Sequence, residues 1–454
     1  MKKTTLLLTA LFLGAVSIFA QQFDDYFEDK TLRLDYIFAG DSASQEIFFQ
    51  EASSTSQWAG RRHNLSQPLL KGNGQITVRA PENGQVIYSN SFSSLFQEWQ
   101  STEEATKVKR AFENCFQVPY PKQTVEVTVS LFDIHGKVAS TLTHLISPAD
   151  ILIREKSSSV KWEYLHKGGE PQNCIDIAIL AEGYSANDAQ KFHDDAQHAC
   201  GFLLGHEPFK SMADKFNIIA VSAESSESGV SVPRKDNWKK TVASAHYDTF
   251  YSDRYLMTTN MQDIYDQLAG VPFEHIIVLA NTWLYGGGGI YNSINVTTSD
   301  HPTARQVLVH EFGHSFGGLG DEYFYDDQYS SMYPADTEPW EPNLTTLVDF
   351  NSKWADMVGK KTTVPTPPIT YGDYDARNTL SFLQLDEKKQ RALVNTVGAY
   401  EGGGYQSKGV YRPAMECRMK INEVEEFCPV CTRALIKMIE YYTEWLQFDK
   451  ILLA

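Results

Sequence analysis

The sequence predicts a mixed α/β (α+β) domain that follows an all-β, sandwich-like N-terminal domain. From Thr31 onward, apolar and polar residues alternate in short runs separated by turn residues, which is typical of half-buried strands. After about residue 165, continuous apolar runs alternate with helical patterns. The chain has 454 residues, more than one hydrophobic core usually serves. We therefore place the domains at residues 22–160 and 165–454, after a signal peptide at residues 1–20.

The N-terminal domain is expected to hold short strands and one helical insertion. Gln123 to Phe132 alternates valines with polar residues and is followed by a turn at His135-Gly136. Glu103 to Phe116 predicts the helix. The other predicted strands are Thr31–Ala39, Gln45–Gln50, Gln75–Ala80, Gln85–Ser89 and Lys137–Leu145.

The second domain is expected to alternate strands with helices in a mixed layer. Ser185 and Asp188 form a capping box that opens a helix to about Leu204. Ser299 or Asp300, with Pro302 in the first turn, is expected to cap a later helix, which carries the informative motif. The remaining predicted elements are strands at Ile175–Leu180, Phe216–Ser222 and Phe273–Ala280, a helix at Asn260–Leu268, and an extended Gly-rich run from Tyr285 to Thr297.

The first 20 residues have the pattern of a cleaved export signal. Lys2 and Lys3 precede an apolar run from Leu6 to Phe19, and Ala20 offers a small residue for cleavage. An uncleaved anchor is the alternative, but the run is short for a membrane span. We expect a bacterial protein that is periplasmic, at the cell surface or secreted, with no transmembrane span after cleavage.

Composition and charge exclude several classes of protein. The chain is 42% hydrophobic and 21% charged, which is ordinary for a globular protein and excludes disorder. The formal net charge is −17, so there is no basic excess to displace the counterions of nucleic acid. We expect no nucleic-acid partner, and a monomer.

The chain has six cysteines, at positions 115, 174, 200, 417, 428 and 431. An even number in an oxidising compartment predicts disulfides, although the sequence does not choose among the pairings. Because Cys417, Cys428 and Cys431 are close in the chain, at least one local bridge is expected. The alternative is a structural zinc on Cys428-Pro-Val-Cys431, which needs two more ligands close by and reduced thiols.

The most informative motif is HEFGHSFGGLGDEY, residues 310–323. His310 and His314 are one helical turn apart, so both imidazoles project from one face and can bind one zinc ion. Glu311 is next to the first histidine and can reach a zinc-activated water as a general base. The sequence therefore predicts a single catalytic Zn²⁺.

A catalytic zinc keeps three protein ligands, and two acids compete for the third place. Asp321 and Glu322 follow a Gly-rich stretch that allows the chain to double back toward the metal. We expect Gly317 or Gly318 to adopt a positive φ. Asp321 is the preferred ligand, and Glu322 is the alternative.

The motif resembles two related groups of peptidases. HExxH followed by glycine and a further ligand is similar to the metzincins, although the position of their third ligand is occupied here by Gly320. The full string, with YRPAMECRMK at 411–420 and FCPVC at 427–431, resembles the bacterial immunoglobulin A peptidase family. TLRLDYIFAGD and WAGRRHNL, at 58–65, resemble the N-terminal domain of that family. The resemblance extends from about residue 30 to the C-terminus.

The resemblance implies further features of the site. It implies a methionine turn beneath the metal, at Met419 rather than Met415. It also implies that Gly286, Gly287, Gly288 and Gly289 form an edge strand that pairs with substrate, with a flexible loop as the alternative. The residues that could stabilise the oxyanion are His246, His275, Tyr405 and Tyr411.

Together these features predict a secreted, metzincin-like zinc metalloendopeptidase that cleaves extracellular proteins. The name of the family suggests host immunoglobulin A, and a mucin is another candidate substrate, but no residue encodes either. Two alternatives from other classes stay open. One is a zinc hydrolase of a non-peptide bond, and the other is a surface binding protein whose β-domain carries the function.

Overall fold

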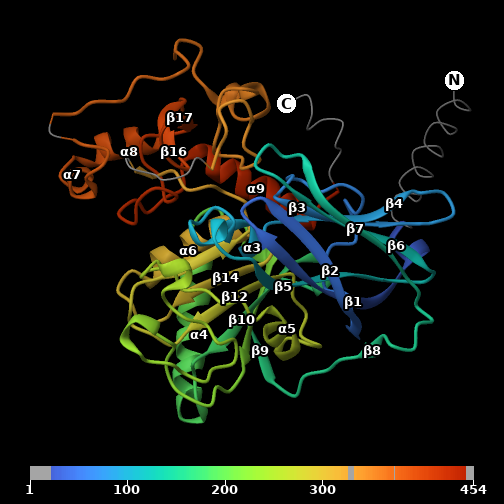
Figure 1. Cartoon of the computed structure of the whole chain (residues 1–454). Coiled ribbons are helices and arrows are strands. Elements are labelled where there is room, and N and C mark those ends of the chain that lie inside the picture. The colour runs from blue at the N-terminus through green and yellow to red at the C-terminus, as the bar shows by residue number, and fades with distance from the viewer. Residues whose placement is uncertain (1–21, 326–331, 373, 446–454) are drawn as a thin grey trace, which may run out of the picture.

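The computed structural model describes residues 22–325, 332–372 and 374–445 and shows a mixed α/β chain with several sheets (Figure 1). Two four-stranded sheets come first, followed by a six-stranded sheet and a three-stranded sheet. In Figure 1 the N-terminal strands, blue to teal, lie beside the six-stranded sheet, green to yellow. The predicted signal peptide at residues 1–20 lies outside the described residues.

The two N-terminal sheets share one hydrophobic core. Their strand orders are β5-β1-β2-β8 and β4-β3-β6-β7. Leu34 and Phe38 of the first sheet and Val127 and Leu131 of the second are fully buried in this core. The elements of this region are α2 (Gln22–Tyr26), β1 (Phe27–Asp41), β2 (Ser44–Ser56), β3 (Gly74–Arg79), β4 (Val86–Phe92), α3 (Leu95–Trp99), β5 (Arg110–Pro121), β6 (Val125–Phe132), β7 (Val138–Ile146) and β8 (Arg154–Glu155).

The strands predicted in this region are confirmed, but the predicted helix at Glu103–Phe116 is wrong. Most of its second half belongs to β5, which pairs antiparallel with β1 from Phe27 to Gly40. That pairing buries Phe112 and Val118, so tertiary contacts override a local helical preference. The helix that interrupts the strands is instead α3, where the Ser94 side chain accepts a hydrogen bond from the Gln97 amide.

The second region is built on a six-stranded mixed sheet of order β13-β14-β12-β10-β11-β9. Its four central strands are parallel, and β9 and β13 run antiparallel at the two edges. The expected domain boundary near residue 165 falls inside β9. The strands are β9 (Lys161–Lys167), β10 (Ile175–Glu182), β11 (Phe216–Ser222), β12 (His275–Ala280), β13 (Gly287–Ile290) and β14 (Ile294–Thr298).

Helices cover both faces of this sheet. The helices α4 (Ala189–Leu204), α6 (Ala304–Ser315) and α9 (Pro429–Thr443) contribute to the core on one face, and α5 (Met261–Gln267) contributes to the core on the other. The predicted capping box of Ser185 and Asp188 is present just before α4. The helix α6 begins at Ala304 with Thr303 at its N-cap, so neither Ser299 nor Asp300 caps it.

The C-terminal part lies next to the end of α6 and adds a small sheet of order β15-β17-β16. No helix in the described ranges is both long and apolar enough to cross a membrane. The elements of this part are β15 (Phe324–Tyr325), α7 (Thr379–Leu383), α8 (Glu387–Asn395), β16 (Tyr400–Gly403) and β17 (Tyr405–Arg412).

The N-terminal region is in direct contact with the six-stranded sheet region. Arg33 forms an ion pair with Asp266, and the Arg61 amide donates a hydrogen bond to Glu274 over 3.0 Å. The Arg61 guanidinium lies 4.8 Å from the ring centre of Tyr441 in α9. These contacts fix one region against the other.

A buried acid in the sheet makes stability depend on pH. Asp176 of β10 is fully buried, and burial raises the pKa of its carboxyl to about 7, although the Asn217 amide donates a hydrogen bond to it. The folded chain therefore holds this proton more tightly than the unfolded chain does. We expect the free energy of unfolding to decrease as pH rises from about 4 toward 7. In Asp176→Asn, this decrease should be smaller by roughly 1 kcal/mol or more. Urea unfolding of both proteins at pH 5 and pH 8 checks this, and identical pH dependence would contradict it.

Candidate metal centre

The helix α6 brings the two motif histidines together. The Nε2 atoms of His310 and His314 are 3.0 Å apart. The Nδ1 atom of His310 lies 3.0 Å from the Arg418 carbonyl oxygen, and that of His314 lies 2.5 Å from the Leu319 carbonyl oxygen. A carbonyl oxygen only accepts, so both imidazoles donate from Nδ1. Each Nε2 therefore points into the triangle and offers a lone pair to a metal ion once it carries no proton.

Asp321 completes a triangle of possible ligand atoms with these histidines. Its Oδ1 atom lies 3.0 Å from His310 Nε2 and 3.2 Å from His314 Nε2. Ligands about 2.0–2.1 Å from a tetrahedral zinc would be about 3.3 Å apart. The donor set and its spacing therefore fit a zinc ion, with one coordination position left for water.

Charge interactions between Asp321 and the two histidines stabilise the triangle. Burial alone would lower the pKa of His314, but the Asp321 carboxylate raises it to about 9. Burial alone would raise the pKa of Asp321, but His314 and His310 hold it well below its usual range. The hydroxyl of Tyr405 donates a hydrogen bond to the other oxygen of Asp321. The carboxylate is therefore ionised and oriented, and a metal ion in the triangle would replace the proton on His314.

A glycine turn returns the chain from α6 to the metal triangle. Gly318 has φ +61°, one of the two positions where a positive φ was expected, and a Cβ atom there would lie 2.6 Å from Leu70. Of the two acids that follow, only Asp321 belongs to the triangle. Glu322 lies with three cysteines instead, where its Oε1 accepts hydrogen bonds from Asn343 over 2.9 Å and from Cys431 over 3.0 Å.

Glu311 lies beside the triangle, and it lines one cleft together with His310, His314 and Asp321. Burial raises the pKa of its carboxyl above the ordinary value. The neighbouring strand β13 packs closely against α6, because a Cβ atom at Gly289 would lie 2.3 Å from the Glu311 carbonyl oxygen. Gly287, Gly288 and Gly289 belong to β13, an edge strand of the sheet, and Gly286 precedes it.

Met419 lies under the histidine helix. It is fully buried, and a Cβ atom at Gly313, between the two histidines, would be 2.7 Å from its sulfur. The Met419 carbonyl accepts a hydrogen bond from the Glu322 amide over 2.8 Å. Met415 packs in a separate cluster with Phe382 and does not support α6.

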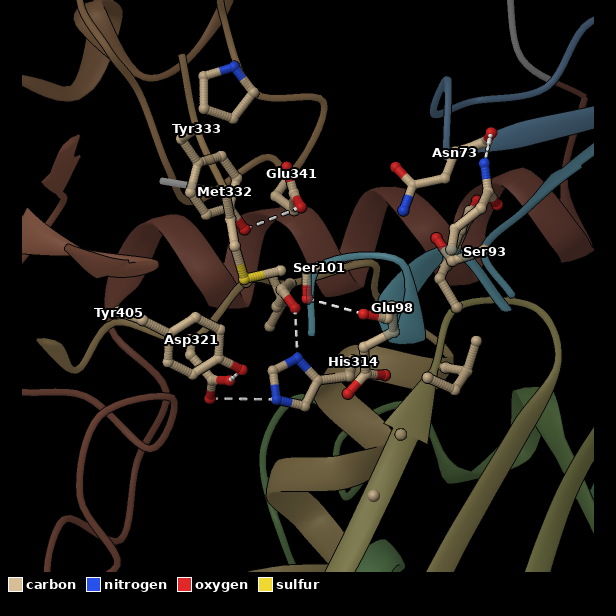
Figure 2. A pocket seen from close by; sticks show the side chains of 18 of the residues that line it. Asn73, Ser93, Glu98, Ser101, His314, Asp321, Met332, Tyr333, Glu341 and Tyr405 are labelled. Atoms are coloured by element: carbon tan, nitrogen blue, oxygen red, sulfur yellow. Dashed lines mark hydrogen bonds and ion pairs between the residues drawn. The ribbon is translucent and has the colours of Figure 1, made fainter. Parts of the chain in front are cut away.

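The N-terminal region forms part of the cleft around the metal triangle, which no motif in the sequence indicates. A cleft of about 1960 Å³ contains the triangle, and Glu98 of α3 forms part of its wall. Figure 2 shows Glu98 close to His314, with Asp321 and Tyr405 beyond the imidazole. Burial raises the pKa of Glu98 to about 7, although Tyr255 donates a 2.6 Å hydrogen bond to it. No local motif marks Glu98, because only the packing of the two regions brings it here.

The four residues proposed to stabilise the oxyanion lie in different parts of the structure. Tyr405 lines the cleft, whereas neither His246 nor Tyr411 is among the described residues that line it. His275 is buried in the core, 5.0 Å from the ring of Phe316. Tyr405 is the candidate that the structure brings to the triangle.

The expected local disulfide among Cys417, Cys428 and Cys431 is not formed. All six cysteines lie in the described part of the chain, and all are free thiols. The sulfurs of Cys417 and Cys431 are 3.8 Å apart, far longer than a disulfide bond of about 2.05 Å. Instead of pairing, three sulfurs converge with Glu322.

A mixed α/β region with HExxH on a helix at an open cleft defines a candidate metal-dependent hydrolase. The sequence model of IgA Peptidase M64 matches residues 164–439, and that of the Peptidase M64 N-terminus matches residues 22–143. The chain therefore belongs to the M64 peptidase family, and the predicted resemblance is confirmed. Membership implies a metallopeptidase with a protein substrate. A comparison with curated proteins finds no match.

The close packing of β13 on α6 predicts that a side chain at Gly289 is not tolerated. Gly289→Ala would place a methyl group against the Glu311 carbonyl and 3.0 Å from His314 Cβ. We expect it to lower the free energy of unfolding by about 1–3 kcal/mol. The control is Gly201→Ala in α4, where no atom of the described part of the chain would lie within 4 Å of the new Cβ and where alanine favours the helix. Thermal unfolding compares the two, and a Gly289→Ala protein as stable as the control would refute the packing argument.

Proposed function

We propose that the protein is an exported zinc metalloendopeptidase in which His310, His314 and Asp321 hold one catalytic ion. The observation that carries the proposal is the triangle of two Nε2 atoms and one carboxylate oxygen, 3.0–3.2 Å apart, in an open cleft. Two imidazoles and a carboxylate form a common ligand set of catalytic zinc. The predicted signal at residues 1–20 supports export.

In this proposal the residues divide the work of peptide hydrolysis. A zinc ion bound to the triangle supplies Lewis acidity toward water and the substrate carbonyl. Glu311 accepts the proton of the attacking water and then donates it to the leaving amine, a role that its raised pKa suits. Tyr405 orients the Asp321 carboxylate through its hydroxyl. Tyr405 is also the candidate donor toward the oxyanion.

The arrangement supports a metzincin-like assignment with an altered third ligand. Met419 packs beneath the histidine helix at Gly313, as a methionine turn would. The third ligand is Asp321, the residue after Gly320, so the chain reaches the metal one position later than in metzincins. The two N-terminal sheets, which share one core, support the sandwich-like assignment.

The edge strand beside the cleft favours an extended peptide as substrate. The strand β13 is an edge strand next to α6, and an extended chain can add to such an edge through backbone hydrogen bonds. At one position of this edge, Gly287 already pairs with Tyr255 in a parallel bridge. Extracellular proteins such as host immunoglobulin A or mucins fit this proposal. A non-peptide substrate remains the second candidate, and substrate profiling separates the two.

Removing the proposed general base should abolish hydrolysis but keep the metal. We expect Glu311→Gln to lower kcat/KM on a protein substrate by roughly 10²–10⁴-fold, because the amide cannot accept the proton of the attacking water. The control is Glu423→Gln, which alters another carboxylate of the cleft wall and should change the rate little. Zinc content measured on the same samples should stay at the wild-type level. A Glu311→Gln enzyme with full activity would contradict the mechanism.

Removing the proposed third ligand should release metal. Asp321→Ala leaves two imidazoles, so we expect the variant to lose one equivalent of zinc during dialysis against a weak chelator. Elemental analysis of protein samples before and after dialysis measures the loss. Retention of the wild-type zinc content by Asp321→Ala would exclude Asp321 as a ligand.

A further inference from the structure

A second cluster of ligand atoms lies in the core behind the metal triangle. It consists of Cys417, Cys428, Cys431 and Glu322, and their ligand atoms all lie within 4.8 Å of one another. All four residues are fully buried. None of them lines the cleft, so the proposed mechanism does not use them.

The spacing in this cluster matches tetrahedral coordination. Two thiolates about 2.3 Å from a tetrahedral zinc lie about 3.8 Å apart. The sulfurs of Cys417 and Cys431 are 3.8 Å apart, and the Glu322 Oε1 atom is 3.0 Å from Cys431 Sγ. The second carboxylate oxygen, Oε2, is buried and has no hydrogen-bond partner among the residues that the structure describes. A fully buried acid with an unpaired oxygen among three thiols is unfavourable unless a cation joins the group.

Burial raises the pKa of the Cys417 and Cys431 thiols, and a helix N-terminus and a backbone amide beside the sulfurs offset part of that cost. Cys428 is the N-cap of α9, and Cys431 lies in the first turn of that helix, whose N-terminus favours anions. The Cys428 amide donates a hydrogen bond to Cys417 Sγ over 3.2 Å. The buried guanidinium of Arg412 interacts electrostatically with Glu322 and offsets part of the charge of the cluster.

We propose that Cys417, Cys428, Cys431 and Glu322 bind a second zinc ion, which is structural. Binding breaks the three S–H bonds, and the O–H bond of Glu322 where it is protonated, and it forms three Zn–S bonds and one Zn–O bond. The released protons go to solvent, and no electrons are transferred. Four protein ligands fill the coordination shell and leave no position for water, as in closed structural sites.

A zinc ion at the second site would hold the residues of the catalytic site in position. Glu322 follows Asp321 directly, and Cys417 precedes Arg418, whose carbonyl oxygen lies 3.0 Å from His310 Nδ1. Met419, under α6, also accepts the Glu322 amide hydrogen bond. A metal ion that joins Glu322, Cys417 and the start of α9 therefore fixes the segments on which the catalytic triangle depends.

The alternative is a disulfide within the cluster, since the chain is predicted to be exported to an oxidising compartment. The two states differ in metal content and in the number of thiols. A zinc site gives two zinc ions per wild-type chain and six titratable thiols in denaturant with chelator. A disulfide gives one zinc ion and four thiols. Both measurements use the intact wild-type protein and need no folded variant.

Variants then locate the second ion. His310→Ala/His314→Ala should keep one equivalent of metal, and its cobalt form should show the sulfur-to-cobalt charge-transfer absorption of thiolate ligands. Adding Cys428→Ser to that variant should remove both the metal and the absorption. The control is Cys200→Ser, which changes a buried cysteine of α4 outside the cluster and should change neither.

The two proposals fail separately in this experiment. One zinc ion in the wild type, with none in the histidine variant, overturns the second site and leaves the catalytic one. If the histidine variant keeps the full wild-type metal content, and its cobalt form shows thiolate ligands, the second site is supported and the catalytic site is overturned. Fewer than six thiols in the denatured, chelated wild type overturns the second site directly.

Discussion

The positions of two imidazole rings are the constraint on which the rest of the site depends. His310 and His314 present their Nε2 atoms to one point because their Nδ1 atoms are held by the carbonyls of Arg418 and Leu319. Both carbonyls lie after α6 in the chain. The helix alone can place the rings on one face, but only the returning C-terminal segments can fix their rotation. The proposed chemistry therefore requires the complete fold around α6, rather than the motif alone.

The sequence predicts best where the decisive interactions are local. Alternation of apolar residues gave most N-terminal strands, and the capping box of Ser185 was found because both partners lie in one turn. The local pattern of Glu103–Phe116 predicts a helix wrongly, because the pairing partner of this segment, β1, is distant in the chain. The sequence does not indicate α3, because its five residues are too few to show a helical period.

The same distinction applies to the site. His310, Glu311 and His314 follow from spacing within one helical turn, and the choice of third ligand could be narrowed to two adjacent acids. The turn at Gly318 directs Asp321 to the histidines and Glu322 to the cysteines, and that division depends on three-dimensional packing. The same holds for Glu98, which reaches the cleft only because α3 packs against the second region.

The glycines of β13 have a further consequence. A strand that lacks side chains at Gly287, Gly288 and Gly289 can hold a bound chain by its backbone but cannot recognise which residues that chain carries. In the proposed binding mode, selectivity must therefore arise on the other walls of the cleft. Those walls include Asn73, Ser93 and Glu98 from the N-terminal region, so in this binding mode the N-terminal region takes part in choosing the substrate while the catalytic residues come from the second region.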